Sequence, residues 1–347
     1  MMRIPSSAFD NINVSYFKYF KGPPSLDINI SRVFKGIRSD VFKDTVLNVR
    51  RFKYDNVELS KHYKSSLPAV TFCGMFLEKR NVENCISYNH LLVIDIDHVP
   101  DNLMDEYRDD LNRDPYVAAF WLSPSGSGYK GLVHLKYDKT IDSLSNKEKH
   151  KMAFRKILKY LLEKYGIALD ESGSDIPRLC YMSWDPDIVV KSEAEAFEIK
   201  LEDNDVLEDN GKKNTSPIRS VQRKEIKLNW NQIIGGANYP LSNHYRSLLN
   251  QIYKKLVKKN LSITDSYTNW VKVAFAIASN IHPVAGKELF LRLCRLDGIG
   301  HDEQKSEHLI FEAYAKTNRK VGFGTIIFLA RQKGLNINTE DRSSKKE

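Results

Sequence analysis

The chain has 347 residues, a formal net charge of +9, 41% hydrophobic residues and 28% charged residues. This length allows two domains that each bury a core, and the positive charge favours a polyanionic partner such as nucleic acid. The four cysteines lack CxxC spacing, which argues against a structural zinc site and a disulfide framework. No apolar leader and no run of eighteen apolar residues occurs, so we expect no membrane partner and a cytoplasmic location.

The N-terminal part begins with a polar, aromatic-rich lead-in at residues 1–25. Between residues 26 and 54, apolar side chains recur at roughly helical spacing, which predicts a helix. The end of this stretch, residues 48–54 (NVRRFKY), has the character of a basic strand.

An apolar run at residues 90–98 (HLLVIDIDH) predicts a buried strand that delivers two carboxylates near its end. Side chains alternate along a strand, so Asp95 and Asp97 share one face. Neighbouring carboxylates raise each other's pKa unless a cation lies between them, and hard oxygen ligands suit Mg²⁺ or Mn²⁺. An acidic turn at a strand end is the plainer alternative, and the DxD pattern alone does not decide between them.

Two predicted strands at residues 118–122 and 131–135 flank a Ser- and Gly-rich loop, SPSGSGYK at residues 123–130. Glycine frees the backbone to turn and present N–H groups, while hydroxyls and a lysine suit a triphosphate. The Walker A spacing and its following helix are missing, and a simple hairpin turn is the alternative. The residues that would bind phosphate are Ser123, Ser125, Gly126, Gly128 and Lys130.

A third acidic segment at residues 169–186 leads into a predicted strand at residues 179–183. It offers three carboxylates that could complete a metal site, of which we rank Asp175 first, ahead of Asp170 and Asp185. Arg178 could bind phosphate. The alternative is a turn with a salt bridge.

The remaining chain predicts helices around a linker. Residues 146–165 form the clearest helical pattern. Residues 201–228 are polar and poor in apolar side chains, as expected of an interdomain linker. Helical patterns follow at residues 243–259, 265–280, 285–297, 305–315 and 324–333, with Asp265 or Ser266 as an N-cap.

Four lysines in the first of these helical patterns fall on one side of the predicted helix. Together with neighbouring tyrosines they could hold single-stranded nucleic acid, although a solvent-facing helix surface is the commoner meaning. These lysines are Lys254, Lys255, Lys258 and Lys259.

The order of the three motifs resembles the catalytic core of the archaeo-eukaryotic primase superfamily. More closely, roughly residues 60–200 are similar to the VirE N-terminal-like primase-polymerase domains of bacterial mobile elements. Residues 240–340 resemble, less specifically, the small helical primase C-terminal domain. The resemblance implies an α+β fold: an RRM-like catalytic domain with a mixed or antiparallel sheet at residues 1–200, the linker at 201–228, and an all-α domain at 229–340.

Carried over to this chain, the resemblance implies that Asp95, Asp97 and Asp175 bind two divalent ions, Mg²⁺ or Mn²⁺. The loop residues, Lys130 and Arg178 would orient the triphosphate of an NTP or dNTP. Many superfamily members have a histidine where this chain has Lys130. His134, on the same strand face, could partly substitute for it, although a core or surface histidine is the plainer reading.

The function implied is template-directed nucleotidyl transfer on single-stranded DNA, with primer synthesis or extension in the replication of a mobile element, plasmid or phage. Alternatives are a non-catalytic nucleic-acid-binding replication or mobilisation factor with a degenerate primase fold, a metal-dependent nuclease, and a protein-interaction module. No Walker motif occurs, so any replicative helicase must be a separate chain. Under the primase hypothesis, Asp95→Ala should abolish synthesis and leave the fold nearly intact.

Overall fold

The computed structural model describes residues 3–5, 9, 11–201, 228–236 and 243–337, so nearly all of the predicted linker lies outside the described residues. The chain divides into two compact units. One comprises Met1–Ile157 with Leu169–Arg219, and the other comprises Leu158–Ala168 with Ser220–Glu347. The first is mixed α/β and the second is helical, which agrees with the α+β expectation at this coarse level.

The first unit contains, within the described residues, a five-stranded and a four-stranded sheet and two small two-stranded sheets. The five-stranded sheet comprises β7 (Leu91–Ile96), β8 (Val117–Leu122), β9 (Tyr129–Tyr137), β11 (Val189–Val190) and β13 (Phe197–Ile199). The four-stranded sheet has the order β10 (Cys180–Tyr181), β4 (Ala69–Thr71), β2 (Asn13–Phe17) and β3 (Leu26–Asn29). The small sheets pair β1 (Arg3–Pro5) with β12 (Glu193–Glu195) and β5 (Gly74–Phe76) with β6 (Cys85–Tyr88).

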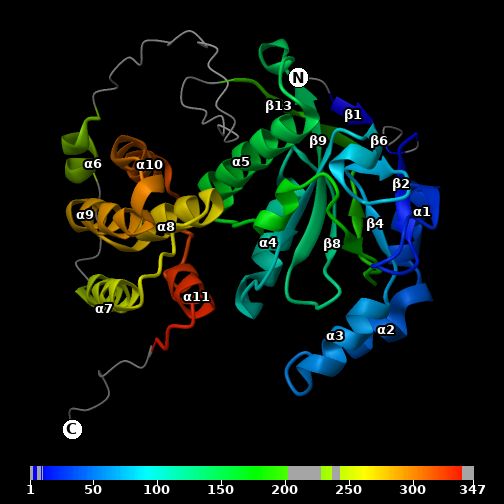
Figure 1. Cartoon of the computed structure of the whole chain (residues 1–347), viewed down its shortest axis with the longest axis horizontal. Helices are drawn as coiled ribbons and strands as arrows, with labels where there is room; N and C mark the ends of the chain where they lie inside the picture. Colours follow the sequence, from blue (N-terminus) through cyan, green and yellow to red (C-terminus); the bar gives the residue numbers. More distant parts are fainter. Residues whose placement is uncertain (1–2, 6–8, 10, 202–227, 237–242, 338–347) are drawn as a thin grey trace. The chain divides into compact units, whose positions relative to one another are not determined.

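Strand β9 organises the five-stranded sheet. It pairs antiparallel with β7 and β8 and parallel with β13, and Figure 1 shows β8 and β9 as long neighbouring strands. All six residues of β7 are buried, which is typical of a strand covered on both faces. The strands predicted from the apolar runs at residues 90–98, 118–122 and 131–135 are therefore confirmed.

The first unit also contains helices, and the boundary between the two units falls within the last of them, α5. They are α1 (Ile30–Arg38), α2 (Lys43–Arg51), α3 (Val57–Ser66), α4 (Met104–Arg113) and α5 (Asn146–Tyr165). The helix predicted at residues 146–165 is confirmed.

The continuous helix predicted between residues 26 and 54 is wrong. Residues 26–29 form β3, and the side chain of Asn29 caps α1 by accepting a hydrogen bond of 2.9 Å from Ser31 N–H. A break at Ser39 separates α1 from α2. The basic strand predicted at residues 48–54 is also wrong, because Val46 and Val49 bury one helical face of α2.

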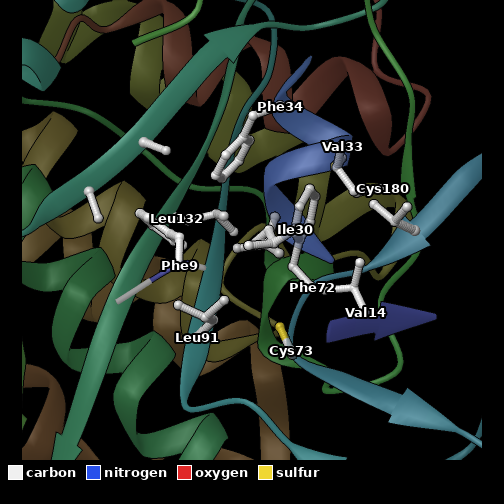
Figure 2. Packing of buried hydrophobic residues seen from close by; sticks show 14 of the residues in the cluster. Phe9, Val14, Ile30, Val33, Phe34, Phe72, Cys73, Leu91, Leu132 and Cys180 are labelled. Atoms are coloured by element: carbon white, nitrogen blue, oxygen red, sulfur yellow. The ribbon is translucent and has the colours of Figure 1, made fainter. Parts of the chain in front are cut away.

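One buried cluster joins α1 to both larger sheets. Figure 2 shows α1 side chains packed against Phe72 of the segment after β4 and against Leu91 and Leu132 of β7 and β9. Cys73 and Cys180 are free thiols buried within this cluster, where they pack as small apolar side chains.

The second unit is built from helices in its described part. They are α6 (Trp230–Gly236), α7 (Asn243–Lys259), α8 (Tyr267–Asn280), α9 (Pro283–Cys294), α10 (Glu303–Lys316) and α11 (Gly324–Gln332). Ser266 is the N-cap of α8 and accepts from Asn269 N–H, and Pro283 occupies the first turn of α9. Among the described residues, no helix is long and apolar enough to cross a membrane.

The lysine cluster of α7 is partly committed to internal contacts. Lys255 Nζ donates to Asn336 O at 2.6 Å, and Lys259 Nζ donates to Gly334 O at 3.0 Å. Both lysines therefore hold the chain that follows α11. These internal contacts do not support the predicted binding of nucleic acid by the cluster, which stays a prediction.

Candidate functional site

Asp95 is the most deeply buried acid at the end of β7, with 2% of its surface exposed. The register of the sheet sets it opposite Lys130 of β9, and its Oδ2 lies 2.5 Å from Lys130 Nζ and 3.4 Å from Arg178 Nη2. Its Oδ1 is buried and has no hydrogen-bond partner among the described residues. A buried carboxylate oxygen without a donor is costly, so this atom is suited to accept a cation.

Asp97 follows the last residue of β7, and its side chain is exposed at the rim of the site. Its pKa is raised, first because surrounding atoms partly desolvate the carboxylate and second because Asp95 repels its charge. Asp170 raises the pKa of Asp97 further, while Lys130 and Lys64 lower it. The expected mutual effect of the DxD carboxylates is thus visible for Asp97.

The third-acid candidates occupy three different environments. Asp170 N–H donates to Asp95 O at 2.8 Å, which places Asp170 beside β7, and its carboxylate caps the short 3₁₀ turn Glu171–Ser174. Asp175 ends that turn and is exposed. Asp185 is buried, where it accepts from Leu122 N–H at 2.8 Å. Of the three candidates, Asp170 is the one whose charge acts on the pKa of Asp97. The ranking from the sequence put Asp175 first.

Lys130 is 8% exposed and points to the carboxylate pair. Burial is the largest single effect and lowers its pKa, but the charge of Asp95, its hydrogen bond and the further charge of Asp97 act together against burial, so the pKa is raised and the ammonium stays charged. Arg178 approaches the same carboxylate with its side chain 36% exposed. Arg178 is thus the cation that a ligand can reach more readily, while Lys130 is fixed in an internal ion pair.

The Ser- and Gly-rich loop closes on itself between β8 and β9. Ser123 N–H donates to Gly128 O and Gly126 N–H donates to Ser123 O, both at 2.9 Å. These two N–H groups therefore close the turn within the loop. The hydroxyls of Ser123, Ser125 and Ser127 form a chain with 3.1 Å spacings. Half-buried Ser125 and Ser127 are the loop groups most available to a ligand.

Gly128 brings this loop against the end of β7. A Cβ at this position would lie 1.9 Å from Ile96 O, so only glycine fits without moving the backbone. We expect Gly128→Ala to lower the free energy of unfolding by about 1–3 kcal/mol or more, measured by urea denaturation. Gly22→Ala is the matched control, because its Cβ would meet Tyr19 O at an ordinary 3.6 Å. Equal stability of the two variants would contradict this close packing.

Arg50 of α2 is a site residue that the sequence pattern did not indicate. Its Nη2 donates to Trp184 O at 2.8 Å and to Ser123 O at 3.3 Å, and its guanidinium lies 5.7 Å from the Trp184 ring centre. A Cβ on Gly126 would touch its side chain at 3.2 Å. Arg50 thus packs against the loop and fixes it to α2. Only its place in a basic segment hinted at this role, because nothing local links it to a loop some seventy residues away.

His134 lies in the core rather than at the carboxylates. Its ring is 4.7 Å from the ring of Phe9, and burial lowers its pKa to about 4, so it is neutral near pH 7. Four residues along a strand separate it from Lys130 by about 13 Å. We therefore leave His134 out of the site proposed below.

The residues at the end of β7 fit a cation in part. Asp95 offers an unpartnered buried oxygen and Asp97 an exposed carboxylate beside it. Across the described part of the chain, however, no group of three or more His, Cys, Asp or Glu side chains has an arrangement that could hold a metal ion. The fit thus rests on the carboxylate pair, with Asp170 as its nearest acidic neighbour.

Comparison with known protein families matches part of the chain. Residues 62–189 are similar to the family described as BT4734-like, N-terminal domain. This range contains the carboxylates, the loop and the cations of the site, but not Arg50. No curated protein and no solved structure matches the chain.

Proposed function

We propose that this protein is a primase-polymerase that transfers nucleotides to a growing strand on a single-stranded DNA template. The observation that carries the proposal is the end of β7, where the unpartnered oxygen of Asp95 lies beside Asp97 and opposite the cations Lys130 and Arg178. Carboxylates that bind cations, next to cations that bind phosphates, are the groups that phosphoryl transfer requires.

In this reaction, the acids would bind the metal ions, and the cationic and hydroxyl side chains would bind the triphosphate. Asp95, Asp97 and one further acid would hold Mg²⁺ or Mn²⁺, and we place Asp170 before Asp175 as that acid because it acts electrostatically on Asp97. When bound, the ions would neutralise charge on the phosphates and lower the pKa of the attacking hydroxyl. Arg178 and the hydroxyls of Ser125 and Ser127 would orient the triphosphate.

The wider assignment follows the resemblance in motif order. We propose a core of the archaeo-eukaryotic primase type in the mixed α/β unit, and a primase C-terminal-like role for the helical unit in holding the first nucleotide or the primer end. A replicative helicase, where one takes part, would be a separate chain. Replication of a mobile element, plasmid or phage is the setting in which such domains are expected.

The test is a gel assay with single-stranded DNA, labelled nucleotides and Mg²⁺ or Mn²⁺, run with and without a primer. We expect extended products from the wild type and from Asp101→Asn, a matched exposed acid outside the site, but not from Asp97→Asn. Products without a primer would identify priming, and products only with a primer would identify extension. Shortened substrate would contradict the proposal and favour a nuclease.

One observation favours a second candidate, a non-catalytic nucleic-acid-binding factor with a degenerate primase fold. Lys130 already neutralises part of the negative charge of Asp95 that would otherwise attract a metal cation. Under this candidate, the protein binds single-stranded DNA, and no condition of the gel assay yields product.

A further inference from the structure

The turn between β2 and β3 exposes two aromatic rings and two lysines. We call residues 18–21 (KYFK) the hairpin tip. Tyr19 is 68% exposed and Phe20 is 39% exposed. The ammonium of Lys18 lies 5.5 Å from the centre of the Tyr19 ring, and that of Lys21 lies 5.9 Å from the centre of the Phe20 ring. Large aromatic side chains side by side at a turn have no role in the core, so they are available to a partner.

A series of contacts connects the hairpin tip to the carboxylate site within the first unit. The Phe20 ring lies 6.3 Å from the ring of Tyr181 in β10. Burial raises the pKa of Tyr181, while the nearby guanidiniums of Arg178 and Arg80 lower it. Arg178 in turn reaches Asp95. These contacts link the exposed rings, through Tyr181 and Arg178, to the proposed reaction centre.

Two neighbouring arginines, Arg80 and Arg178, lie beside Tyr181. Arg80 Nη1 donates to Pro177 O at 2.5 Å, and Arg80 makes no ion pair with a described carboxylate. Burial lowers its pKa, and the like charge of Arg178 lowers it further. Asp95 is the acid near Arg178, and Lys130 already neutralises it. Arg80, an exposed guanidinium whose hydrogen-bond partner is a backbone carbonyl, is suited to bind an anion.

We propose that the hairpin tip, Tyr181 and Arg80 form the surface that binds a single strand of nucleic acid on its way to the carboxylate site. Tyr19 and Phe20 stack on unpaired bases, and Arg80 binds a backbone phosphate. Exposed rings stack most readily on unpaired bases, because inserting into a duplex costs unstacking energy, and this favours a single-stranded partner. The inference rests on the proposed function for the nature of the strand, but it assigns residues outside the proposed catalytic groups.

The test is fluorescence anisotropy with a labelled oligothymidine of about 16 nucleotides, within the range that single-strand binding sites cover. All variants are made on the Asp97→Asn chain, so that binding is measured without turnover. We expect Tyr19→Ala with Phe20→Ala to weaken binding by about tenfold or more. We expect Arg80→Ser to weaken binding and to make the plot of log affinity against log salt shallower by about 0.7.

Tyr54→Ala is the matched control. Tyr54 is 77% exposed and lies under the ammonium of Lys53 at 4.6 Å, but it has no connection to Tyr181 or Arg80 among the described contacts. The proposal is supported if this variant binds the oligonucleotide with wild-type affinity and if the parent chain binds duplex DNA more weakly than single-stranded DNA. Equal losses in Tyr54→Ala and the hairpin variants would overturn the surface assignment while the gel assay still decided the proposed function. Absence of any oligonucleotide binding by the parent chain would overturn both.

Discussion

Asp95→Ala is expected to destabilise the protein by about 3–5 kcal/mol, because it leaves Lys130 buried without its partner. Lys130 is only 8% exposed and its ammonium lies 2.5 Å from the carboxylate that the variant removes. Urea denaturation followed by circular dichroism measures this loss as a lower midpoint with an unchanged slope. The outcome expected from the sequence, an intact fold in this variant, is therefore revised.

The control is a variant that removes both charges, Asp95→Leu with Lys130→Met. Replacing a buried ion pair by apolar side chains of similar size is often neutral, so the double variant should recover most of the lost stability. A double variant as unstable as Asp95→Ala would contradict an energetic role of the pair. Because of this coupling, lost synthesis in Asp95→Ala alone would not identify a metal ligand.

Apolar patterning predicted the strands that position the site. The runs that end in Asp95 and that flank the Ser- and Gly-rich loop became β7, β8 and β9, because an uninterrupted apolar segment can only be buried. Patterning also placed α5. It failed at residues 26–54, where apolar spacing fits both a helix and an alternating strand, and pairing of β3 with β2 decided the first four residues.

The internal electrostatics of the site could not be predicted from one strand at a time. The sequence presented Lys130 as a phosphate ligand, but the antiparallel register sets it opposite Asp95 and makes it an ion-pair partner. Likewise, spacing gave no reason to prefer Asp170, whose place beside β7 depends on a backbone hydrogen bond to Asp95. Arg50 reached the loop through packing of α2, which no local pattern encodes.

Asp97→Asn is expected to abolish the proposed synthesis, by at least about a hundredfold, and yet to stabilise the protein in the absence of divalent ions. The carboxylate is exposed at the rim, so the amide fits without burying a new group. Its pKa is raised in the folded protein by partial desolvation and by Asp95, which means that its ionised form is less favourable there than in the unfolded chain. The variant removes this penalty.

The pH dependence gives this second expectation a definite sign. A carboxyl whose folded pKa lies above its unfolded value lowers stability fully at pH values above the folded pKa, and the loss disappears as pH falls below the unfolded value, near 4. Thermal unfolding without divalent ions should therefore show Asp97→Asn melting above the wild type at pH 7, with the difference vanishing toward pH 4. Added Mn²⁺ should raise the melting temperature of the wild type more than that of the variant. A wild type that melts higher than Asp97→Asn at pH 7 without metal would show that Lys64 and Lys130 already neutralise Asp97, and a cation would then have little to gain at this site.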